Sequence, residues 1–271
     1  MPELPEVETT RRGIAPALVG HRVTDLIVRD RRLRWPIAAT LEAAVRGLRV
    51  RAVDRRAKYL IIQLETGSLI VHLGMSGSLR LTGPNTPPKS HEHWDLVLDS
   101  GQALRFHDPR RFGSLLWTQD DPDKHPLLKK LAPEPLSAAF DGAYLFRVTR
   151  KRAVAIKQLI MNSQLVVGVG NIYASEALFR AGISPRRAAR RLTKAEALKL
   201  SGAIKAVLTA AIKIGGTTLR DYVNADGAPG YFKQKLFVYE RGGERCRVCK
   251  SSVKQFTQGQ RSTYWCATCQ R

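Results

Sequence analysis

Four cysteines near the end of this 271-residue sequence form two Cys-x-x-Cys pairs. Cys246 and Cys249 make the first pair, and Cys266 and Cys269 make the second after sixteen intervening residues. This spacing indicates a zinc site, because each tight turn offers two thiolates to one metal ion. Four thiolates complete a tetrahedral structural site and leave no position for a substrate, so we expect one structural Zn²⁺. Unrelated thiols or a redox pair are the less favoured alternative.

The first residues offer a second kind of chemistry. The sequence starts Met-Pro-Glu, and an initiator methionine is readily removed before a small residue such as proline. Pro2 would then carry a secondary amine, which titrates near about 8 and is partly neutral and nucleophilic at neutral pH. Such an amine attacks a sugar C1′ to give an iminium ion, and the adjacent Glu3 is placed to move protons. The same residues also suit an ordinary helix start, so the motif alone leaves both interpretations open.

Three further segments could contact nucleic acid. Asn171 follows a Gly-x-Gly turn, where it could receive a phosphate or simply cap a helix. Arg261, between the cysteine pairs, could be a phosphate ligand or a solvated surface residue. In "DPRRFG", Phe112 beside Arg110 could wedge into a base stack, or the loop could simply bury its phenylalanine.

Two histidine-bearing segments give weaker signals. "HLGMSGSLR" puts Met75 between two glycines that allow close backbone approach, although methionine is more often a core residue. His91 and His93 are separated by one residue. We interpret these two histidines as a surface turn, since no third metal ligand is evident.

These residues need elements that position them. A helix is predicted from Pro5 to Gly20, with Val7, Ile14 and Leu18 on one face. Several short strand-like runs follow up to residue 117 and favour a β-sandwich or barrel. A linker rich in proline and charge is expected around 119–137, and helical patterns follow it. They are "AVAIKQLIMN", the stretch with Ala174, Ala177, Leu178 and Ala181, and a helix capped by Thr193 and Glu196.

The charge balance points to a polyanionic partner. Lys and Arg total 45 against 23 Asp and Glu, which gives a net charge of +22. Nucleic acid is the commonest partner of so basic a chain. The N-terminus lacks the pattern of a signal peptide, and no apolar run approaches the roughly 20 residues that span a bilayer. We therefore expect a cytoplasmic protein with no membrane partner.

Taken together, the motifs resemble the bacterial formamidopyrimidine-DNA glycosylases, the bifunctional enzymes that remove oxidised purines such as 8-oxoguanine. The likeness runs nearly end to end through "PELPEVET", "RRAKYL", "HLGMSGSLR", "DPRRFG", "PEPLS", "VVGVGNIYASEALF", "GGTTLRDY", "GYF" and "QRSTYWC". The first and sixth of these motifs are highly specific, and their order and spacing make a chance match implausible.

The resemblance implies a multidomain α+β fold. Residues 1–130 would form a catalytic β-sandwich domain with flanking helices, 131–222 a helix-two-turn-helix DNA-binding domain, and 223–271 the end of a base-capping loop and a zinc finger. It also implies a monomer that excises 8-oxoguanine and formamidopyrimidines from double-stranded DNA and then cuts the abasic strand by β,δ-elimination. Such an enzyme would act in the bacterial cytoplasm, at the nucleoid.

The resemblance assigns roles residue by residue. The catalytic group would be Pro2 as the nucleophile, Glu3 as the acid/base residue, Lys58 near the lesion and Arg261 as a phosphate ligand. The predicted DNA contacts are His91, Arg110, Asn171, Lys157, Met75, Phe112 and Tyr239. The loop around 217–232 matches the one that closes over the everted base. This sequence departs from the family at Arg220, where relatives often have lysine, and at Lys250, where glycine is common and a left-handed backbone is expected.

Two rival functions are weighed against this one. An endonuclease VIII-like enzyme would act on oxidised pyrimidines, but the expected wedge residues and "PELPEVE" rather than "PEGPE" favour the purine enzyme. A non-catalytic damage-binding protein would need only the zinc tail and the basic helices. Pro2, Glu3 and Lys58 argue against that alternative.

Overall fold

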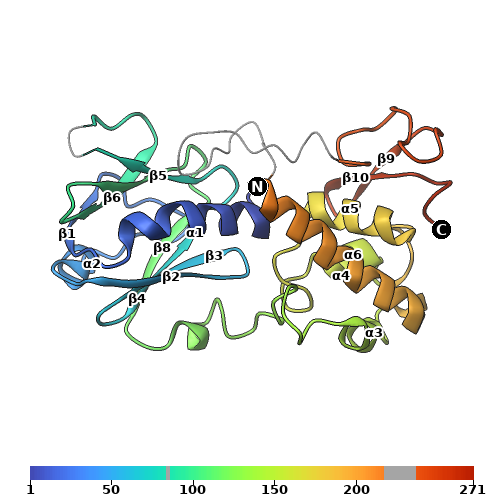
Figure 1. Ribbon diagram of the computed structural model, residues 1–271, viewed down its shortest axis with the longest axis horizontal. Helices are drawn as coiled ribbons and strands as arrows, with labels where there is room; N and C mark the ends of the chain where they lie inside the picture. Colours follow the sequence, from blue (N-terminus) through green and yellow to red (C-terminus); the bar gives the residue numbers. More distant parts are fainter. Residues whose placement is uncertain (84–85, 217–235) are drawn as a thin grey trace. The chain divides into compact units, whose positions relative to one another are not determined.

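The protein forms two compact units. The computed structural model describes residues 1–83, 86–216 and 236–271 (Figure 1). The first unit contains residues 1–129 and 214–216, and the second contains 130–213 and 236–271. The boundary after Lys129 falls inside the segment that the sequence predicts as a linker.

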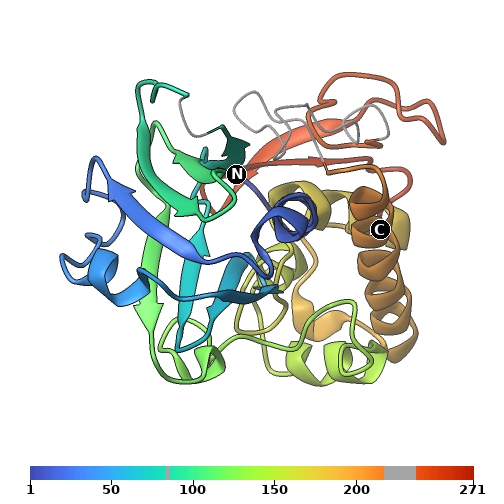
Figure 2. The same ribbon diagram turned by 60° about the vertical axis from the view of Figure 1, so that its left-hand side comes forward.

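Strands dominate the described part of the first unit and confirm the predicted β-sandwich. They form two four-stranded antiparallel sheets. One sheet has the order β1 (Val23–Val28), β6 (Glu92–Leu98), β7 (Ala103–His107), β5 (Ser78–Thr82). The other has the order β2 (Val50–Arg56), β3 (Tyr59–Leu64), β4 (Ser68–His72), β8 (Ser114–Thr118). Apolar residues of both sheets share one hydrophobic core, and the arrangement can be followed in Figure 2.

Two helices accompany these sheets. α1 (Leu4–Leu18) buries Val7, Ile14 and Leu18, as the sequence predicts, and packs against β2, β3 and β5. The short α2 (Leu41–Val45) packs against β1. A 3₁₀ turn, η1 (Pro122–Lys124), follows the last strand. The sequence pattern does not predict strand β2, because it lies in a run of basic residues. Its buried residues Val50 and Val53 are three positions apart, across a register shift, and Arg51 between them is exposed.

Two connections between the sheets run beside each other. The loop at 73–77 leads from β4 to β5, and the loop at 108–113 leads from β7 to β8. Because β4 pairs with β8 and β5 pairs with β7, the two loops are held together at both ends. The topology therefore places "LGMSG" against "DPRRFG".

Helices make up most of the second unit. They are α3 (Gly142–Thr149), α4 (Ile156–Ile160), α5 (Asn171–Ala181) and α6 (Lys194–Lys213), with a 3₁₀ turn η2 (Ala189–Arg191) before α6. The predicted capping box at the start of α6 is present, since the Glu196 N–H donates to Thr193 Oγ1 and the Thr193 N–H donates to Glu196. α4 is shorter than its predicted segment because Ala155 is extended and bridges to Ala188.

A two-stranded hairpin completes the second unit. β9 (Lys254–Gln258) pairs with β10 (Arg261–Trp265) through a two-residue turn at Gly259 and Gln260. Both turn residues have positive φ, as a type I′ hairpin requires. Among the residues that the structure describes, no helix has the length and apolar character needed to cross a membrane.

Candidate nucleic-acid site and metal centre

The start of the chain is held in place before α1. Pro2 is buried and Glu3 is only 2% exposed. The backbone N–H of Glu3 donates to Glu6 Oε2 at 2.8 Å, which pairs the first residues with the first helical turn. Gly216 comes so close to the buried Glu6 that a Cβ there would lie 3.0 Å from Glu6 Oε1. Pro2 and Glu3 are thus held in position, and Glu6 is the side chain that contacts the backbone of Glu3.

Lys58 lies in the tight turn between β2 and β3. Ala57 has a φ of 55°, so the turn is left-handed at the residue before Lys58. Tyr59 pairs with His72 across β3 and β4, and their ring centroids lie 4.8 Å apart. Burial, with added repulsion from Lys58 and Arg34, lowers the pKa of His72 to about 4. His72 is therefore a neutral neighbour of Lys58. The sequence motifs do not predict this pair, because it depends on the register between β3 and β4.

The loops at 73–77 and 108–113 expose the residues expected to enter DNA. Met75 is 40% exposed and Phe112 is 42% exposed, so neither is a core residue. The guanidinium of Arg110 lies over the Phe112 ring, 5.1 Å from its centroid. The neighbouring Arg111 instead forms an ion pair with Asp30 at 2.7 Å. The residues that the sequence singled out in these loops, Met75, Arg110 and Phe112, are therefore all exposed.

The two histidines that lie between these loops in the sequence, His91 and His93, have different environments. His91 is exposed with a φ of 65°, and its ring lies edge-on to His107. His93 lies in β6, is 3% exposed and hydrogen-bonds through Nε2 to the Asp108 carbonyl at 2.8 Å. The prediction of a shared surface turn is wrong for His93, because this residue lies in β6, where residues 92–95 are all buried, whereas His91 lies in the turn before the strand.

Lys157 connects three elements of the second unit. Its ammonium donates to Asn171 Oδ1 at 2.6 Å, to Thr263 Oγ1 at 2.7 Å and to the Ser262 carbonyl at 3.3 Å. The side chain is nearly buried, at 2% exposure. It thereby ties α4 to the start of α5 and to β10 of the hairpin.

Asn171 is the first residue of α5, and Gly170 occupies the cap position. The N-cap alternative is therefore wrong. The Asn171 side chain instead bonds to Lys157 and donates from Nδ2 to the Ser262 carbonyl at 2.9 Å. Its orientation is therefore set by Lys157 of α4 together with the hairpin, and not by a capping bond at the start of α5.

Tyr239 lies beside the hairpin. Its ring meets Tyr264 edge-on at 5.3 Å. Its backbone N–H donates to the buried Glu176 carboxylate at 3.0 Å, and the N–H groups of Phe237 and Val238 donate to the same carboxylate. Glu176 of α5 thus anchors the described segment that enters the zinc finger.

Arg261 stands exposed at the first position of β10, directly after the hairpin turn. A cavity of about 220 Å³ opens beside it. Its lining comprises Lys157, Gln158, Met161, Asn162, Gln258, Gly259 and Arg261. The predicted phosphate ligand thus borders a polar cavity within the second unit.

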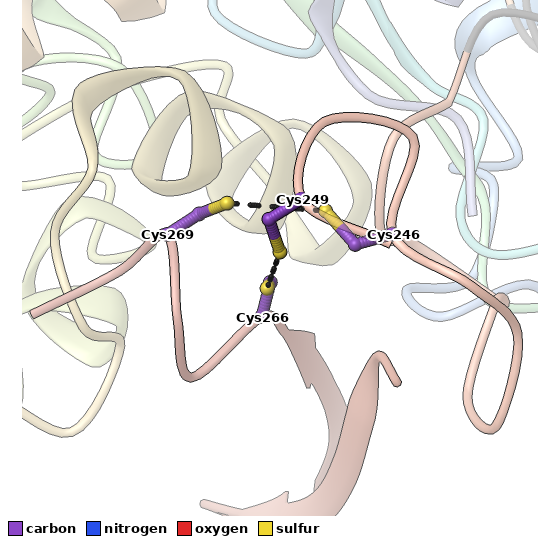
Figure 3. Close-up of side chains that lie close together, drawn as sticks. All are labelled: Cys246, Cys249, Cys266 and Cys269. Atoms are coloured by element: carbon purple, nitrogen blue, oxygen red, sulfur yellow. Dashed lines mark hydrogen bonds between the residues drawn. The ribbon is translucent and has the colours of Figure 1, made fainter. Parts of the chain in front are cut away.

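The four cysteines gather at one point (Figure 3). Their Sγ atoms all lie within 4.8 Å of one another, with Cys249 and Cys266 at 3.4 Å and Cys246 and Cys269 at 3.9 Å. A tetrahedral zinc with Zn–S bonds of about 2.3 Å separates its sulfurs by about 3.8 Å. The donor set and spacing therefore fit one Zn²⁺. Lys250 has the expected left-handed backbone, with a φ of 65°.

Two features implied by the resemblance lie outside the described residues. They are the loop expected at 217–232 and the departure at Arg220.

Family models cover most of the chain. The N-terminal domain of formamidopyrimidine-DNA glycosylase matches residues 1–115, the H2TH domain of the same enzyme matches 131–223, and the zinc finger found in FPG and IleRS matches 243–271. A curated formamidopyrimidine-DNA glycosylase from Stutzerimonas stutzeri is 59% identical over 271 residues, which is 100% of both chains.

Solved structures give the same result. The MutM (Fpg) protein of Thermus thermophilus superposes with a TM-score of 0.89 at 42% identity, covering 99% of this chain and 98% of that one. Lactococcus lactis Fpg in complex with DNA containing an abasic site superposes with a TM-score of 0.92 at 31% identity, covering 99% of each chain. The fold and cysteine centre define a zinc-finger protein of the H2TH class. More particularly, the chain belongs to the formamidopyrimidine-DNA glycosylase family.

Proposed function

We propose that this protein is a bifunctional DNA glycosylase and AP lyase that excises oxidised purines from double-stranded DNA. The observation that carries the proposal is the buried start of the chain, where Pro2 and Glu3 are fixed against α1 in a member of this family. 8-Oxoguanine and formamidopyrimidines are the proposed lesions. The relatives named for this activity, and a solved relative bound to abasic DNA, support the proposal.

Pro2 is the proposed nucleophile. Removal of Met1 converts its amide nitrogen into a secondary amine, which attacks C1′ of the damaged nucleotide. The bond from C1′ to the base breaks, the base leaves with its bonding electrons, and a proton from an acid neutralises it. The nitrogen then loses its proton, its lone pair breaks the bond from C1′ to O4′, and O4′ takes up a proton, which leaves an iminium ion at C1′. This ion makes the C2′ protons acidic, so β-elimination expels the 3′ phosphate and δ-elimination expels the 5′ phosphate. The amine is then regenerated by hydrolysis.

Glu3 and Lys58 assist this chemistry. Glu3 is covalently adjacent to the nucleophile and is the proposed proton carrier at the sugar. Lys58 is proposed to supply a positive charge near the lesion phosphates, and its neighbour His72 is neutral. Arg261 is the fourth member of the predicted catalytic group, and we propose that it holds a phosphate and so fixes the strand for attack.

The proposed DNA contacts come from both units. In the segment 1–130, Met75, Arg110 and Phe112 fill the space that the everted nucleotide leaves, and His91 contacts the backbone. In the segments 131–222 and 223–271, Asn171 and Tyr239 contact phosphates. For Lys157, the three hydrogen bonds of its ammonium support the proposal that it acts on DNA by orienting Asn171.

The zinc centre has a structural role in this proposal. Cys246, Cys249, Cys266 and Cys269 would hold one Zn²⁺, which supplies the cross-link that a small finger needs in place of a large core. We propose that the protein acts as a monomer at the chromosome in the bacterial cytoplasm, as the bacterial source of its relatives supports.

Borohydride trapping tests the proposed nucleophile. The processed protein is incubated with duplexes that contain 8-oxoguanine or an oxidised pyrimidine, with borohydride present to reduce the iminium ion to a stable adduct. We expect a covalent complex with the 8-oxoguanine duplex that disappears in Pro2→Gly. Mass spectrometry of the N-terminus establishes whether Met1 has been removed. No adduct with either duplex, despite binding and a free Pro2 amine, contradicts the proposal, and a preference for the pyrimidine duplex favours an endonuclease VIII-like enzyme.

A further inference from the structure

One buried carboxylate lies between the two loops that carry the exposed wedge residues. Asp108 is 0% exposed. Its Oδ1 accepts a hydrogen bond from Ser76 Oγ at 2.9 Å, and its Oδ2 accepts one from the Gly113 N–H at 2.8 Å. Ser76 directly follows Met75, and Gly113 directly follows Phe112. Each oxygen of Asp108 thus holds the neighbour of one wedge residue.

The backbone of Asp108 extends this junction to a third segment. Its carbonyl accepts a hydrogen bond from His93 at 2.8 Å, and its N–H donates to the His91 carbonyl at 3.0 Å. The exposed His91 therefore shares its anchor with the two loops. Three predicted DNA-contacting residues are therefore connected to Asp108. His91 is hydrogen-bonded to it directly, and Met75 and Phe112 are each next to a residue that is hydrogen-bonded to it.

The two loops also touch through glycines. A Cβ on Gly74 would lie 2.5 Å from the Gly113 nitrogen and 2.5 Å from the Phe112 carbonyl carbon. A Cβ on Gly113 would lie 3.0 Å from Asp108 Oδ2 and 2.9 Å from the His72 carbonyl oxygen. No larger residue fits at either position, so the loops are in direct backbone contact and the carboxylate closes the junction between them.

We propose that Asp108 is a positioning residue that sets the spacing of the Met75 and Phe112 loops before DNA binds. It acts on eversion of the damaged nucleotide and not on the chemistry at C1′. Because the two side chains must enter one gap in the base stack, a fixed spacing between their loops avoids the cost of ordering them during insertion. The inference rests on the proposed function and adds a residue that does not touch DNA.

The test compares two substrates of the same protein. Excision of 8-oxoguanine from an intact duplex needs eversion of a stacked, paired nucleotide, whereas a preformed abasic site has no base to unstack. Asp108→Ala removes both hydrogen bonds, and Ser76→Ala removes one. We expect both variants to lower the ratio of excision to abasic-site cleavage, by about tenfold for Asp108→Ala, the factor that corresponds to 1.4 kcal/mol.

Two variants serve as controls. Asp108→Asn keeps both contacts, because its Oδ1 can accept from the Gly113 N–H and its Nδ2 can donate to Ser76 Oγ, so we expect it to restore the ratio. Ser114→Ala truncates a buried hydroxyl that has no hydrogen-bond partner among the described residues, so the ratio is expected to stay at its wild-type value. Fluorescence of 2-aminopurine next to the lesion reports eversion directly, and should rise more slowly in Ser76→Ala.

The outcomes separate the two proposals. A wild-type protein that acts on neither substrate overturns the proposed function and this inference with it. An active wild type in which Asp108→Ala and Ser76→Ala leave the ratio and the eversion rate unchanged overturns only the role of Asp108. An equal fall on both substrates, with a lowered unfolding midpoint, also overturns it, because Asp108 then serves only the stability of the fold.

Discussion

His72 shows how one strand pairing creates chemistry that a motif does not reveal. Its ring packs on Tyr59 and its Nδ1 accepts the Gly74 N–H at 2.9 Å, so it is a half-buried side chain hydrogen-bonded to the first glycine of the loop that carries Met75, and its low pKa keeps it neutral. Burial is the largest cause of its lowered pKa, and the charge of Lys58 is the next. The environment of Lys58 therefore contains a group whose titration reports on the lysine charge.

Replacing Lys58 by methionine should raise the pKa of His72. The substitution removes one positive charge that disfavours the imidazolium ion, but burial remains, so the pKa should rise above about 4 and stay below 6.5. NMR titration of the His72 Cε1–H signal measures the change. Arg51→Met removes a charge from the exposed face of β2 and is not expected to shift the signal. An unchanged pKa in Lys58→Met would show that the ammonium does not act on His72.

At the scale of single residues, the sequence indicates candidate functional residues more readily than it indicates which side chains lie next to them. The motifs single out Pro2, Arg110 and Phe112 because their residue types suit the chemistry, and the family resemblance adds Lys58. They do not reveal Asp108, whose role depends on a side chain held between two loops far apart in the sequence. They also misplace His93, since it lies in the buried strand β6 whereas His91 lies in the exposed turn before that strand.

Among the elements, α1 and the β2–β3 turn are linked by an arginine. Arg55 donates to Glu8 Oε2 at 3.2 Å and to the Ala57 carbonyl at 2.8 Å. The helix that starts after Pro2 and Glu3 is thereby connected to the turn that carries Lys58. Burial favours the neutral form of Glu8, but hydrogen bonds from Arg11 and Arg12 and nearby charges outweigh it and lower the pKa from 4.5 to about 2.

Glu8 should make the stability of the first unit depend on acid pH. Its contribution to the free energy of unfolding is complete above pH 4.5 and is lost as the pH falls through about 2, because the folded carboxylate resists protonation more than the unfolded one does. Urea unfolding between about pH 5.5 and 2.5 should therefore show a smaller pH slope in Glu8→Gln than in the wild type. Asp120→Asn, at an exposed position, is the matched control. Equal slopes in Glu8→Gln and the wild type would refute the link.

The hairpin of β9 and β10 depends on the metal centre more than on its core. Its small apolar cluster contains Val238 and Val253 with two of the cysteines and Phe179 of α5. So few buried side chains cannot fold such a segment alone. The hairpin supplies partners of Lys157 and Asn171, and also carries Arg261, so loss of the metal should disconnect the proposed phosphate-binding residues of the second unit.

Chelation, or the substitution Cys249→Ser, should therefore abolish specific DNA binding without unfolding the first unit. Zinc content by mass spectrometry, DNA affinity by fluorescence anisotropy and the NMR spectrum of the sandwich measure the three effects separately. Ser252→Ala, at an exposed position in the same finger, should keep both zinc and affinity. Retained specific affinity in a zinc-free protein would contradict the structural role.

Element types are the most predictable feature of the fold. Alternation and turn residues predict most strands, and the Thr193 and Glu196 pair marks the start of α6 correctly. The predictions fail where tertiary contacts override local pattern. Ala155 forms a β-bridge with Ala188, and this bridge shortens α4. The sequence pattern does not predict β2, because its apolar residues are widely spaced among arginines.

For the whole molecule, the charge of +22 makes a quantitative prediction about DNA affinity. Each phosphate contact releases condensed counterions, so the logarithm of affinity should fall with the logarithm of salt concentration with a slope of about −0.9 per contact. Arg261→Gln should reduce the steepness of that slope by about 1 on every DNA sequence. Arg46→Gln makes the same change in net charge, but Arg46 is bound to Asp25 at 2.6 Å and is not a predicted contact, so the slope should stay as in the wild type. Fluorescence anisotropy from about 50 to 300 mM salt measures both variants. Equal losses of slope would show that affinity depends on total charge, and then Arg261 would not be a phosphate ligand.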